Sequence, residues 1–448
     1  LTFKLRTSGG DPFATYLALR EKARAGACAF VRFGDEDVLS FSPEQFFAVD
    51  GRRITARPMK GTVGRAPDVA GDERRRAELV TDQKQRAENL MIVDLLRNDL
   101  ARVAETGSVC VTDLFTVETY PRFHTLTSGI EATLREPAVF PCGSVTGAPK
   151  IRAMEIIREV EDEPRGVYCG AVGYAMRGKM AFNVAIRTLT LNGGSGEMGV
   201  GGGIVWDSEP ASEYAECLLK ARFLADADEP FRLIETMRWS TDTGFHLIDR
   251  HLRRLRTSAR YFGFLFNERD IRLGLDRALE GAHGLQRVRL TLGVRGDTQI
   301  EIAPLALPEA DTVWRYAFAP VPVSSVDWRV HHKTTQRALY DSALAAAEGC
   351  DEVVFVNERG EVTEGSRTNI FLERDGVWLT PPLSCGLLDG CLRHELIENG
   401  PQRVTESVLR PEDLEGGKVW FGNALRGLIP GRSFEGVRGA ADSVPLRP

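Results

Sequence analysis

The chain changes its composition once, and this change constrains its possible folds more than any other feature. Residues 225–230, Ala-Asp-Ala-Asp-Glu-Pro, interrupt the apolar pattern, and Lys333 and Lys418 are the only lysines beyond them. Of the 448 residues, about 220 lie on each side of this break, and a typical domain has roughly 100 to 200. We therefore predict one domain over residues 1–226 and a second over 233–435. Residues 227–232 form the linker between them, and 436–448 form a C-terminal tail.

The composition argues against several classes of protein. Hydrophobic residues make up 43% and charged residues 27%, and the net charge of −6 gives no basic excess for nucleic acid or an anionic membrane. No run of about 18 apolar residues is long enough to span a bilayer. The eight cysteines form no C-x-x-C pair, which favours reduced thiols in a cytoplasmic protein. Since the chain starts at Leu1, without Met and already in an alternating pattern, we expect an N-terminal portion to be missing.

Lys60 stands at the end of a strand-like run in the first half. Pro58 removes a backbone donor just before it, and Gly61 frees the backbone just after it. A lysine held in this way becomes a nucleophile if burial or neighbouring charges lower its pKa from about 10.4. A solvated lysine at a strand end is the alternative that this motif leaves open.

Two predicted helices of the first half carry candidate metal carboxylates. The helix over 82–100 brings Glu88 into a buried face, where a carboxylate needs an arginine, hydrogen bonds or a metal. In the helix over 212–220, Glu216 and Lys220 are four apart and share a face. They form either a surface ion pair or a site in which Glu88 and Glu216 bind Mg²⁺ beside a lysine.

Other polar residues of the first half have less specific surroundings. The sequence Ser-Pro-Glu at 42–44 is typical of a helix start, with Glu44 in the first turn, and residues 65–76 read as a solvated loop. A strand is predicted over 115–128, where His124 is either a core residue or a catalyst.

Two glycine-containing stretches are candidates for binding an anion. Residues 141–150 form a predicted Gly/Ser/Thr-containing loop that runs into a helix. Free backbone N–H groups at the start of such a helix can bind a carboxylate or a phosphate. Gly201–Gly203 form a second place where the backbone can approach a ligand closely.

The motifs of residues 1–226 together resemble the chorismate-utilising enzymes, which include anthranilate, aminodeoxychorismate, isochorismate and salicylate synthases. They are, in order along the chain, RPMKGT, AENLMIVDLLRNDL, FHTLTSG, GSVTGAPKIRAMEII, YCGAVGY, AIRT, GGGIVWDS and SEYAECLLK. The resemblance implies an α+β fold that binds chorismate and Mg²⁺ between two sheets.

The resemblance also assigns roles to single residues of the first half. It implies Mg²⁺ carboxylates at Glu88, Glu216 and Glu213, a general acid for the departing 4-hydroxyl at Glu44, and a histidine near the enolpyruvyl group at His124. Substrate contacts are implied at Ser144, Thr146, Tyr174, Arg187, Gly202 and Lys220.

Lys60 separates the branches of this family. The anthranilate-forming branch has P-I-A-G-T at this position, whereas a lysine resembles aminodeoxychorismate synthase, in which it attacks C2 of chorismate before ammonia enters at C4. Cys142 and Met59 depart from the usual glycine and isoleucine.

The second half contains its own candidate site. Lys333 precedes a helical run, Arg254 lies in an arginine-rich helix over 246–262, and Glu364 follows a hairpin turn at Arg359–Gly360. A loop over 386–393 leads into a helix and is a further candidate for binding an anion.

Residues 230–435 resemble the fold-type IV pyridoxal-phosphate enzymes, which include branched-chain and D-amino-acid transaminases and aminodeoxychorismate lyase. The resemblance rests on LIETMR, HLRRLRTSA, VTEGSRTNIFL, LLDG and FGNALRGLIP. It implies that Lys333 holds the cofactor covalently and that Glu364 contacts the pyridine nitrogen. The cofactor phosphate is then bound by Arg254 and the N–H groups of Cys391 and Leu392, while Ala424 replaces a hydroxyl that many relatives have.

The two resemblances together predict synthesis of 4-aminobenzoate, a folate precursor. The first domain would aminate chorismate, and the second would remove pyruvate from the product. We expect ammonia to come from a separate glutamine amidotransferase subunit, and a homodimer to form through the second domain. Three alternatives stay open: an anthranilate-type or isochorismate-type first domain, a transaminase second domain, and an inactive assembly subunit.

Overall fold

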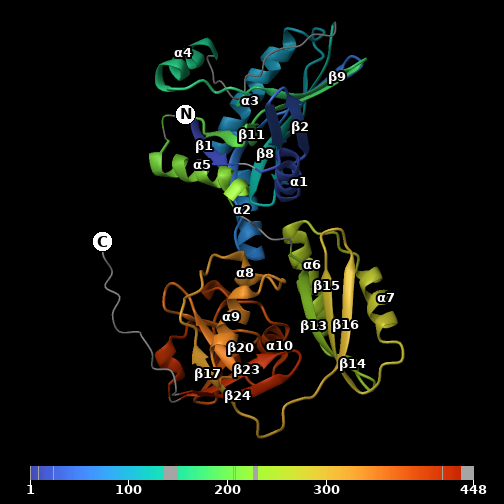
Figure 1. Cartoon of the computed structure of the whole chain (residues 1–448), viewed down its shortest axis with the longest axis vertical. Coiled ribbons are helices and arrows are strands. Elements are labelled where there is room, and N and C mark those ends of the chain that lie inside the picture. Colours follow the sequence, from blue (N-terminus) through green and yellow to red (C-terminus); the bar gives the residue numbers. More distant parts are fainter. Residues whose placement is uncertain are drawn as a thin grey trace. The chain divides into compact units, whose positions relative to one another are not determined.

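The structure is a computed structural model that describes residues 2–8, 10–23, 25–135, 150–204, 206, 208–225, 231–415 and 417–434. The chain divides into two compact units, Leu1–Arg65 with Ala70–Asp228, and Ala66–Val69 with Glu229–Pro448 (Figure 1). Both units combine helices with largely antiparallel sheets, so the predicted α+β class is confirmed.

A five-stranded antiparallel sheet forms one part of the first unit. Its apolar face packs against α1 (Pro12–Ala23) and α5 (Pro210–Ala225), where Tyr16, Phe41 and Met198 lie in one buried cluster. Its strands, in spatial order, are β1 (Thr2–Ser8), β12 (Ser195–Gly201), β11 (Thr188–Asn192), β3 (Glu36–Ser42) and β2 (Ala27–Phe33).

A seven-stranded sheet forms the other part of the first unit. The helix α3 (Gln83–Ala101) lays Ile92, Leu96 and Leu100 on its core, and this confirms the helix predicted over 82–100. Asp82 begins that helix by accepting a hydrogen bond from Gln85 N. The strand order is β6 (Met59–Gly64), β8 (Phe123–Thr133), β5 (Arg53–Arg57), β4 (Gln45–Asp50), β10 (Lys179–Val184) and β9 (Ala171–Met176), and β7 (Cys110–Thr119) also pairs with β8.

Three predictions for the first unit were wrong. Residues 42–44 connect β3 to β4 and start no helix. The expected loop at 65–76 contains the start of α2 (Val69–Thr81), and the single strand expected over 115–128 is the hairpin β7–β8. Helix α4 (Lys150–Val160) completes the described helices of this unit.

The second unit contains a four-stranded sheet that is covered by helices on one face. Met237, Val288 and Leu290 of the sheet share one buried cluster with residues of α6 (Ile248–Phe262) and α7 (Glu268–Ala278). Figure 1 shows α6 beside β13 and α7 beside β16. The strand order is β14 (Gly244–Phe245), β13 (Leu233–Ser240), β15 (Leu285–Leu292) and β16 (Thr298–Pro304).

An eight-stranded sheet forms the rest of the second unit. Its core includes Phe355, Phe371 and Phe421, none of which is accessible to solvent. The strand order is β19 (Val362–Gly365), β18 (Glu352–Val356), β17 (Trp314–Phe318), β24 (Gly427–Ser433), β23 (Lys418–Asn423), β20 (Asn369–Arg374), β21 (Val377–Thr380) and β22 (Val404–Glu406). Its helices are α8 (Trp328–His331), α9 (Ala338–Ala346) and α10 (Cys391–Asn399), with short 3₁₀ turns at Leu383–Cys385 and Pro411–Leu414.

Among the described residues, no helix is both long and apolar enough to cross a membrane.

Candidate active sites

Lys60 projects from β6 toward the helix α3. Its Nζ lies 3.6 Å from Oε2 of Glu88, and both side chains keep some contact with solvent. The close approach of strand and helix depends on Gly61, whose φ is +86° and where a Cβ would lie only 2.8 Å from Gln85 Oε1. The K-G pair of the sequence therefore brings the amine and the carboxylate together.

The glycines that follow β12 bring backbone to the same place. A Cβ at Gly203 would lie 3.0 Å from Lys60 Nζ, and one at Gly202 would lie 2.9 Å from Oε2 of Glu213. Side chains at these positions would fill the space beside Lys60, so glycine leaves room there for a ligand that meets the backbone.

Lys220 is held at the end of β12. Its Nζ donates to the carbonyl of Gly201 at 2.9 Å and lies 2.7 Å from Glu216 Oε1. The ion pair expected between Glu216 and Lys220 is therefore present, next to the glycine pair that contacts Lys60 and Glu213.

The predicted metal carboxylates do not gather into one cluster within the described part of the chain. Glu88, Glu213 and Glu216 do not come within 4.8 Å of one another as a group of three. Each is turned to another partner, since Glu88 faces Lys60, Glu216 faces Lys220 and Glu213 accepts from Ser208 Oγ at 2.6 Å. Their oxygen donors suit Mg²⁺, and in this structure each carboxylate has another partner.

Arg187 lies half-buried and has no carboxylate partner among the described residues. Its guanidinium stacks 4.1 Å from the ring centre of Phe123, and its backbone φ is +49°. Burial lowers the pKa of Arg187 to about 10. A half-buried cation without a carboxylate partner favours an anionic ligand. Phe123 pairs with Gly64 on β6, the strand of Lys60.

His124 belongs to a buried hydrogen-bonded network that uses both of its ring nitrogens. Nδ1 lies 2.9 Å from Thr119 Oγ1, and Nε2 lies 3.0 Å from Oδ1 of Asp72, which also pairs with Arg65. Burial alone would raise the pKa of Asp72, but the bonds from His124 and Arg65 outweigh it and hold the pKa at about 2. Sequence reasoning missed Asp72, since it lay in the stretch that was interpreted as a loop.

The remaining predicted residues of the first unit have other surroundings or fall outside the described residues. Glu44 is buried between β3 and β4, and its carbonyl accepts from Val184 N. Tyr174 is 55% exposed on β9, at the opposite end of the strand order from β6, so the structure does not bring it to Lys60. Ser144 and Thr146 fall outside the described residues.

Lys333 lies where the two sheets of the second unit meet. Its carbonyl accepts from Ile234 N on β13, and the next residue, Thr334, bridges to Leu233. Burial, together with nearby Arg254 and Arg337, lowers the pKa of Lys333 to about 8. A substantial neutral fraction near neutral pH suits an amine that must react with a carbonyl group.

Glu364 is buried on β19 with two hydrogen-bond donors. Its Oε1 accepts from the hydroxyl of Tyr340 at 2.7 Å, and its Oε2 accepts from Leu388 N at 3.1 Å. Burial raises the pKa of Glu364 to about 7, against the opposing effect of these donors and of Arg337 and Lys333. A cationic ring nitrogen would favour the ionised form of this carboxylate.

Arg254 reaches from α6 to the start of α10. It donates to both oxygens of Glu235, at 2.9 and 2.6 Å, and to the carbonyl of Asp389 at 3.1 Å. Asp389 lies two residues before Cys391, which begins α10, so a cation and the N–H groups of a helix start lie together. Ala424 shares a buried cluster with Cys391 and Leu392.

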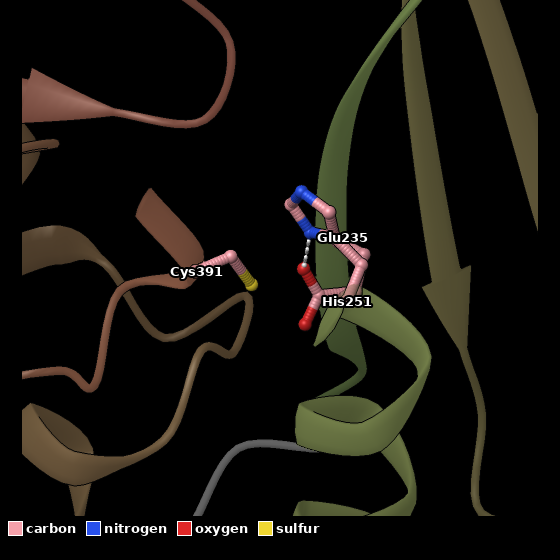
Figure 2. Close-up of side chains that lie close together, drawn as sticks. All are labelled: Glu235, His251 and Cys391. Atoms are coloured by element: carbon pink, nitrogen blue, oxygen red, sulfur yellow. Dashed lines mark hydrogen bonds and ion pairs between the residues drawn. The ribbon is translucent and has the colours of Figure 1, made fainter. Parts of the chain in front are cut away.

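Figure 2 shows Glu235, His251 and Cys391 close together in the interior, an arrangement that could hold a metal ion. His251 Nδ1 lies 2.6 Å from Glu235 Oε2. Burial would lower the pKa of His251, but contacts with Cys391 and Glu235 raise it to about 9. A protonated imidazole cannot bind a metal, and Arg254 already occupies the carboxylate, so the cluster suits an anion at α10 better.

The residues of the second unit fit pyridoxal phosphate in their chemistry. The amine of Lys333 would meet its aldehyde, and the carboxylate of Glu364 would meet its ring nitrogen. Arg254 and the N-terminus of α10 would meet its phosphate. Sequence reasoning missed the supporting residues Glu235, His251 and Tyr340, although Glu235 stands inside the LIETMR motif.

Comparison with known proteins covers the two halves separately. Residues 1–226 match the family model of chorismate binding enzymes, and residues 232–434 match that of amino-transferase class IV. The first half is 47% identical over 219 residues to aminodeoxychorismate synthase component 1 of Escherichia coli, covering 47% of this chain and 48% of that protein. It is also 47% identical over 220 residues to aminodeoxychorismate synthase of Streptomyces griseus, covering 47% and 30%. The chain thus spans about half the length, or less, of these relatives.

The second half is similar to a solved structure from Mesorhizobium loti, a provisionally named amino-acid aminotransferase. The identity is 42%, the match covers 46% of this chain and 100% of that one, and the TM-score is 0.44. By its two family-model matches, the chain belongs to the chorismate-binding enzymes through its first half, and an amino-transferase class IV domain forms its second half.

Proposed function

We propose that the chain makes 4-aminobenzoate from chorismate in two steps, amination by the first half and removal of pyruvate by the second. The observation that carries this proposal is Lys60 beside Glu88 in a half that is 47% identical to aminodeoxychorismate synthase component 1, on one chain with an amino-transferase class IV domain. A second domain that consumes the product of the first explains why the two are joined.

In the first step, the neutral amine of Lys60 attacks C2 of chorismate and the 4-hydroxyl leaves with a proton from Glu44. Ammonia then adds at C4 and displaces the lysine, which restores the free amine. Arg187 and Lys220 hold the substrate carboxylates, and Mg²⁺ bound by Glu88 and Glu216 would neutralise charge there. A separate glutamine amidotransferase subunit supplies the ammonia.

In the second step, pyridoxal phosphate supplies an electron sink for the substrate amine when it is bound. Lys333 takes the proton from the ring carbon that carries the amino group, and Glu364 stays ionised opposite the ring nitrogen. Arg254 and the start of α10 hold the phosphate. Departure of the enolpyruvyl group as pyruvate leaves the aromatic ring of 4-aminobenzoate. We further propose that this half forms a homodimer.

The test separates the two steps. The chain, incubated with chorismate, Mg²⁺ and an ammonium salt, should accumulate aminodeoxychorismate in the Lys333→Ala variant and release pyruvate in the unaltered chain loaded with pyridoxal phosphate. Transfer of the amino group to added 2-oxo acids without release of pyruvate would instead make the second half a transaminase.

A further inference from the structure

The turn that leads into α10 contacts two of the groups that would hold the cofactor. Leu388 N donates to Glu364 Oε2 at 3.1 Å, at the end of the site that would take the ring nitrogen. One residue further on, the carbonyl of Asp389 accepts from Arg254 at 3.1 Å, at the end that would take the phosphate. A shift of this turn would therefore displace both groups.

The backbone of the turn packs closely on β20. Asn369 Nδ2 donates to the carbonyl of Leu388 at 2.9 Å. A Cβ at Gly390 would lie only 1.9 Å from Asn369 Oδ1, so glycine allows the backbone to pass directly over the amide. The side chain of Asp389 is 37% exposed by contrast, and its position depends on the side chains that bind it.

His394 binds this carboxylate from within α10. Its Nδ1 lies 3.0 Å from Asp389 Oδ2, and its Nε2 lies 2.9 Å from Oε1 of Glu398, one turn further along the helix. Ionised carboxylates only accept hydrogen bonds, so the imidazolium form satisfies both contacts. Arg393 reaches the other oxygen of Asp389 at 3.4 Å, near the limit for a hydrogen bond, which makes His394 the closer partner.

The far end of this link is anchored on α6. Arg250 donates to Glu398 Oε2 at 2.8 Å, and it lies four residues before Arg254 on the same face of α6. One helix thus holds the turn in two ways, through the carbonyl of Asp389 and through the chain of contacts that His394 completes.

We propose that His394 is a positioning residue of the cofactor site in the second half. It fixes the carboxylate of Asp389, and with it the turn whose carbonyl orients Arg254 and whose end starts α10. Donors that are already in place bind a phosphate without a further cost of ordering, so His394 strengthens cofactor binding without touching the cofactor. The inference rests on the proposed function in one respect, the assignment of the phosphate to Arg254 and the start of α10.

The test uses two amide variants, each of which keeps one half of the imidazole. The amide nitrogen of asparagine lies close to the place of Nδ1, whereas that of glutamine reaches the place of Nε2. His394→Asn therefore keeps the contact with Asp389, and His394→Gln keeps only the contact with Glu398. In fluorescence titrations of the full chain with pyridoxal phosphate, His394→Gln should raise the dissociation constant about fivefold, and His394→Asn should change it by less than about twofold.

A double variant tests whether His394 acts through Asp389. Asp389→Asn should weaken binding at least as much as His394→Gln does, and the two changes together should weaken it no further than Asp389→Asn alone, since both remove one contact. His283→Asn, in the exposed connection between α7 and β15, is the control and should leave the affinity unchanged. Circular dichroism of the cofactor-free chains should be the same throughout.

An unchanged dissociation constant in His394→Gln, or equal losses in the two His394 variants, would overturn the proposal. Additive losses in the double variant would overturn it as well, because the two residues would then act independently. If the variants bind pyridoxal phosphate as predicted but the loaded, unaltered chain releases no pyruvate from aminodeoxychorismate, the proposed function fails and the role of His394 stands.

Discussion

The hydroxyl of Tyr340 donates a hydrogen bond of 2.7 Å to the buried carboxylate of Glu364. This bond stabilises the ionised form against a burial that raises the pKa of Glu364 to about 7. In the proposed function this carboxylate is charged when it holds a protonated ring nitrogen, so we expect Tyr340 to set the pH range in which the cofactor binds.

Replacing Tyr340 by Phe should weaken binding of pyridoxal phosphate about tenfold at pH 7. The pKa of Glu364 rises further without the hydroxyl, so the carboxyl is protonated over more of the pH range, and a hydrogen bond to a charged group is worth about 2 kcal/mol. Affinity, measured by fluorescence titration, should recover as the pH is raised, with a midpoint higher than that of the unaltered chain. Tyr316→Phe serves as the control, and equal midpoints in all three proteins would contradict the role of Tyr340.

Replacing Lys60 by Arg should abolish amination while it preserves the fold. Arginine keeps a positive charge opposite Glu88, but its guanidinium stays protonated and is no nucleophile. Formation of aminodeoxychorismate, measured by chromatography, should fall at least a hundredfold, while the melting temperature should stay close to that of the unaltered chain. Lys179→Arg, on β10 of the same sheet, is the matched control. Substantial amination by the Lys60→Arg variant would rule out a covalent role.

The stability of the first unit should decrease between about pH 4 and pH 2 through Asp72. Its folded-state pKa of about 2 lies below the ordinary value of 3.8, so the stabilisation is complete above the unfolded pKa and is lost as the pH falls through the folded one. The difference amounts to about 2 kcal/mol. Urea unfolding at several pH values should show this decrease, and the Asp72→Asn variant should lack it. A variant with the same pH dependence would contradict the assignment.

The cofactor should be attached to Lys333 and to no other lysine of the second half. Borohydride reduction of the loaded chain, followed by peptide mapping, should label the peptide that contains Lys333. Because its pKa lies near 8, the rate of loading should rise with pH up to about that value, since the neutral amine is the reactive form. Labelling of Lys418, which lies exposed beside Glu373, would contradict the prediction.

The sequence predicted the elements that have strong local signals. The helix around Glu88 has an apolar face and an Asp82 cap. The arginine-rich helix that contains Arg254 was expected over 246–262 and spans Ile248–Phe262. The contact between Lys60 and Glu88 could be predicted only from the family motifs, because no local sequence pattern shows that β6 packs beside α3.

Other features depended on contacts that are distant in the sequence. Asp72 lies in a helix so rich in charge that no apolar period distinguished it from a loop. Tyr340 and Glu364 are 24 residues apart, and Arg254 meets Asp389 over 135 residues, so only the folded sheets bring these pairs together. The hairpin β7–β8 was read as one strand because Pro121, a turn residue, was not used to divide it.

Analysis of the products tests the central claim most directly. The full chain is incubated with chorismate, Mg²⁺, an ammonium salt and pyridoxal phosphate, beside a Lys60→Ala variant, and the products are identified by mass spectrometry. The account predicts 4-aminobenzoate and pyruvate in equal amounts from the unaltered chain and neither from the variant. Anthranilate as the product, or 4-aminobenzoate made equally well without Lys60, would contradict it.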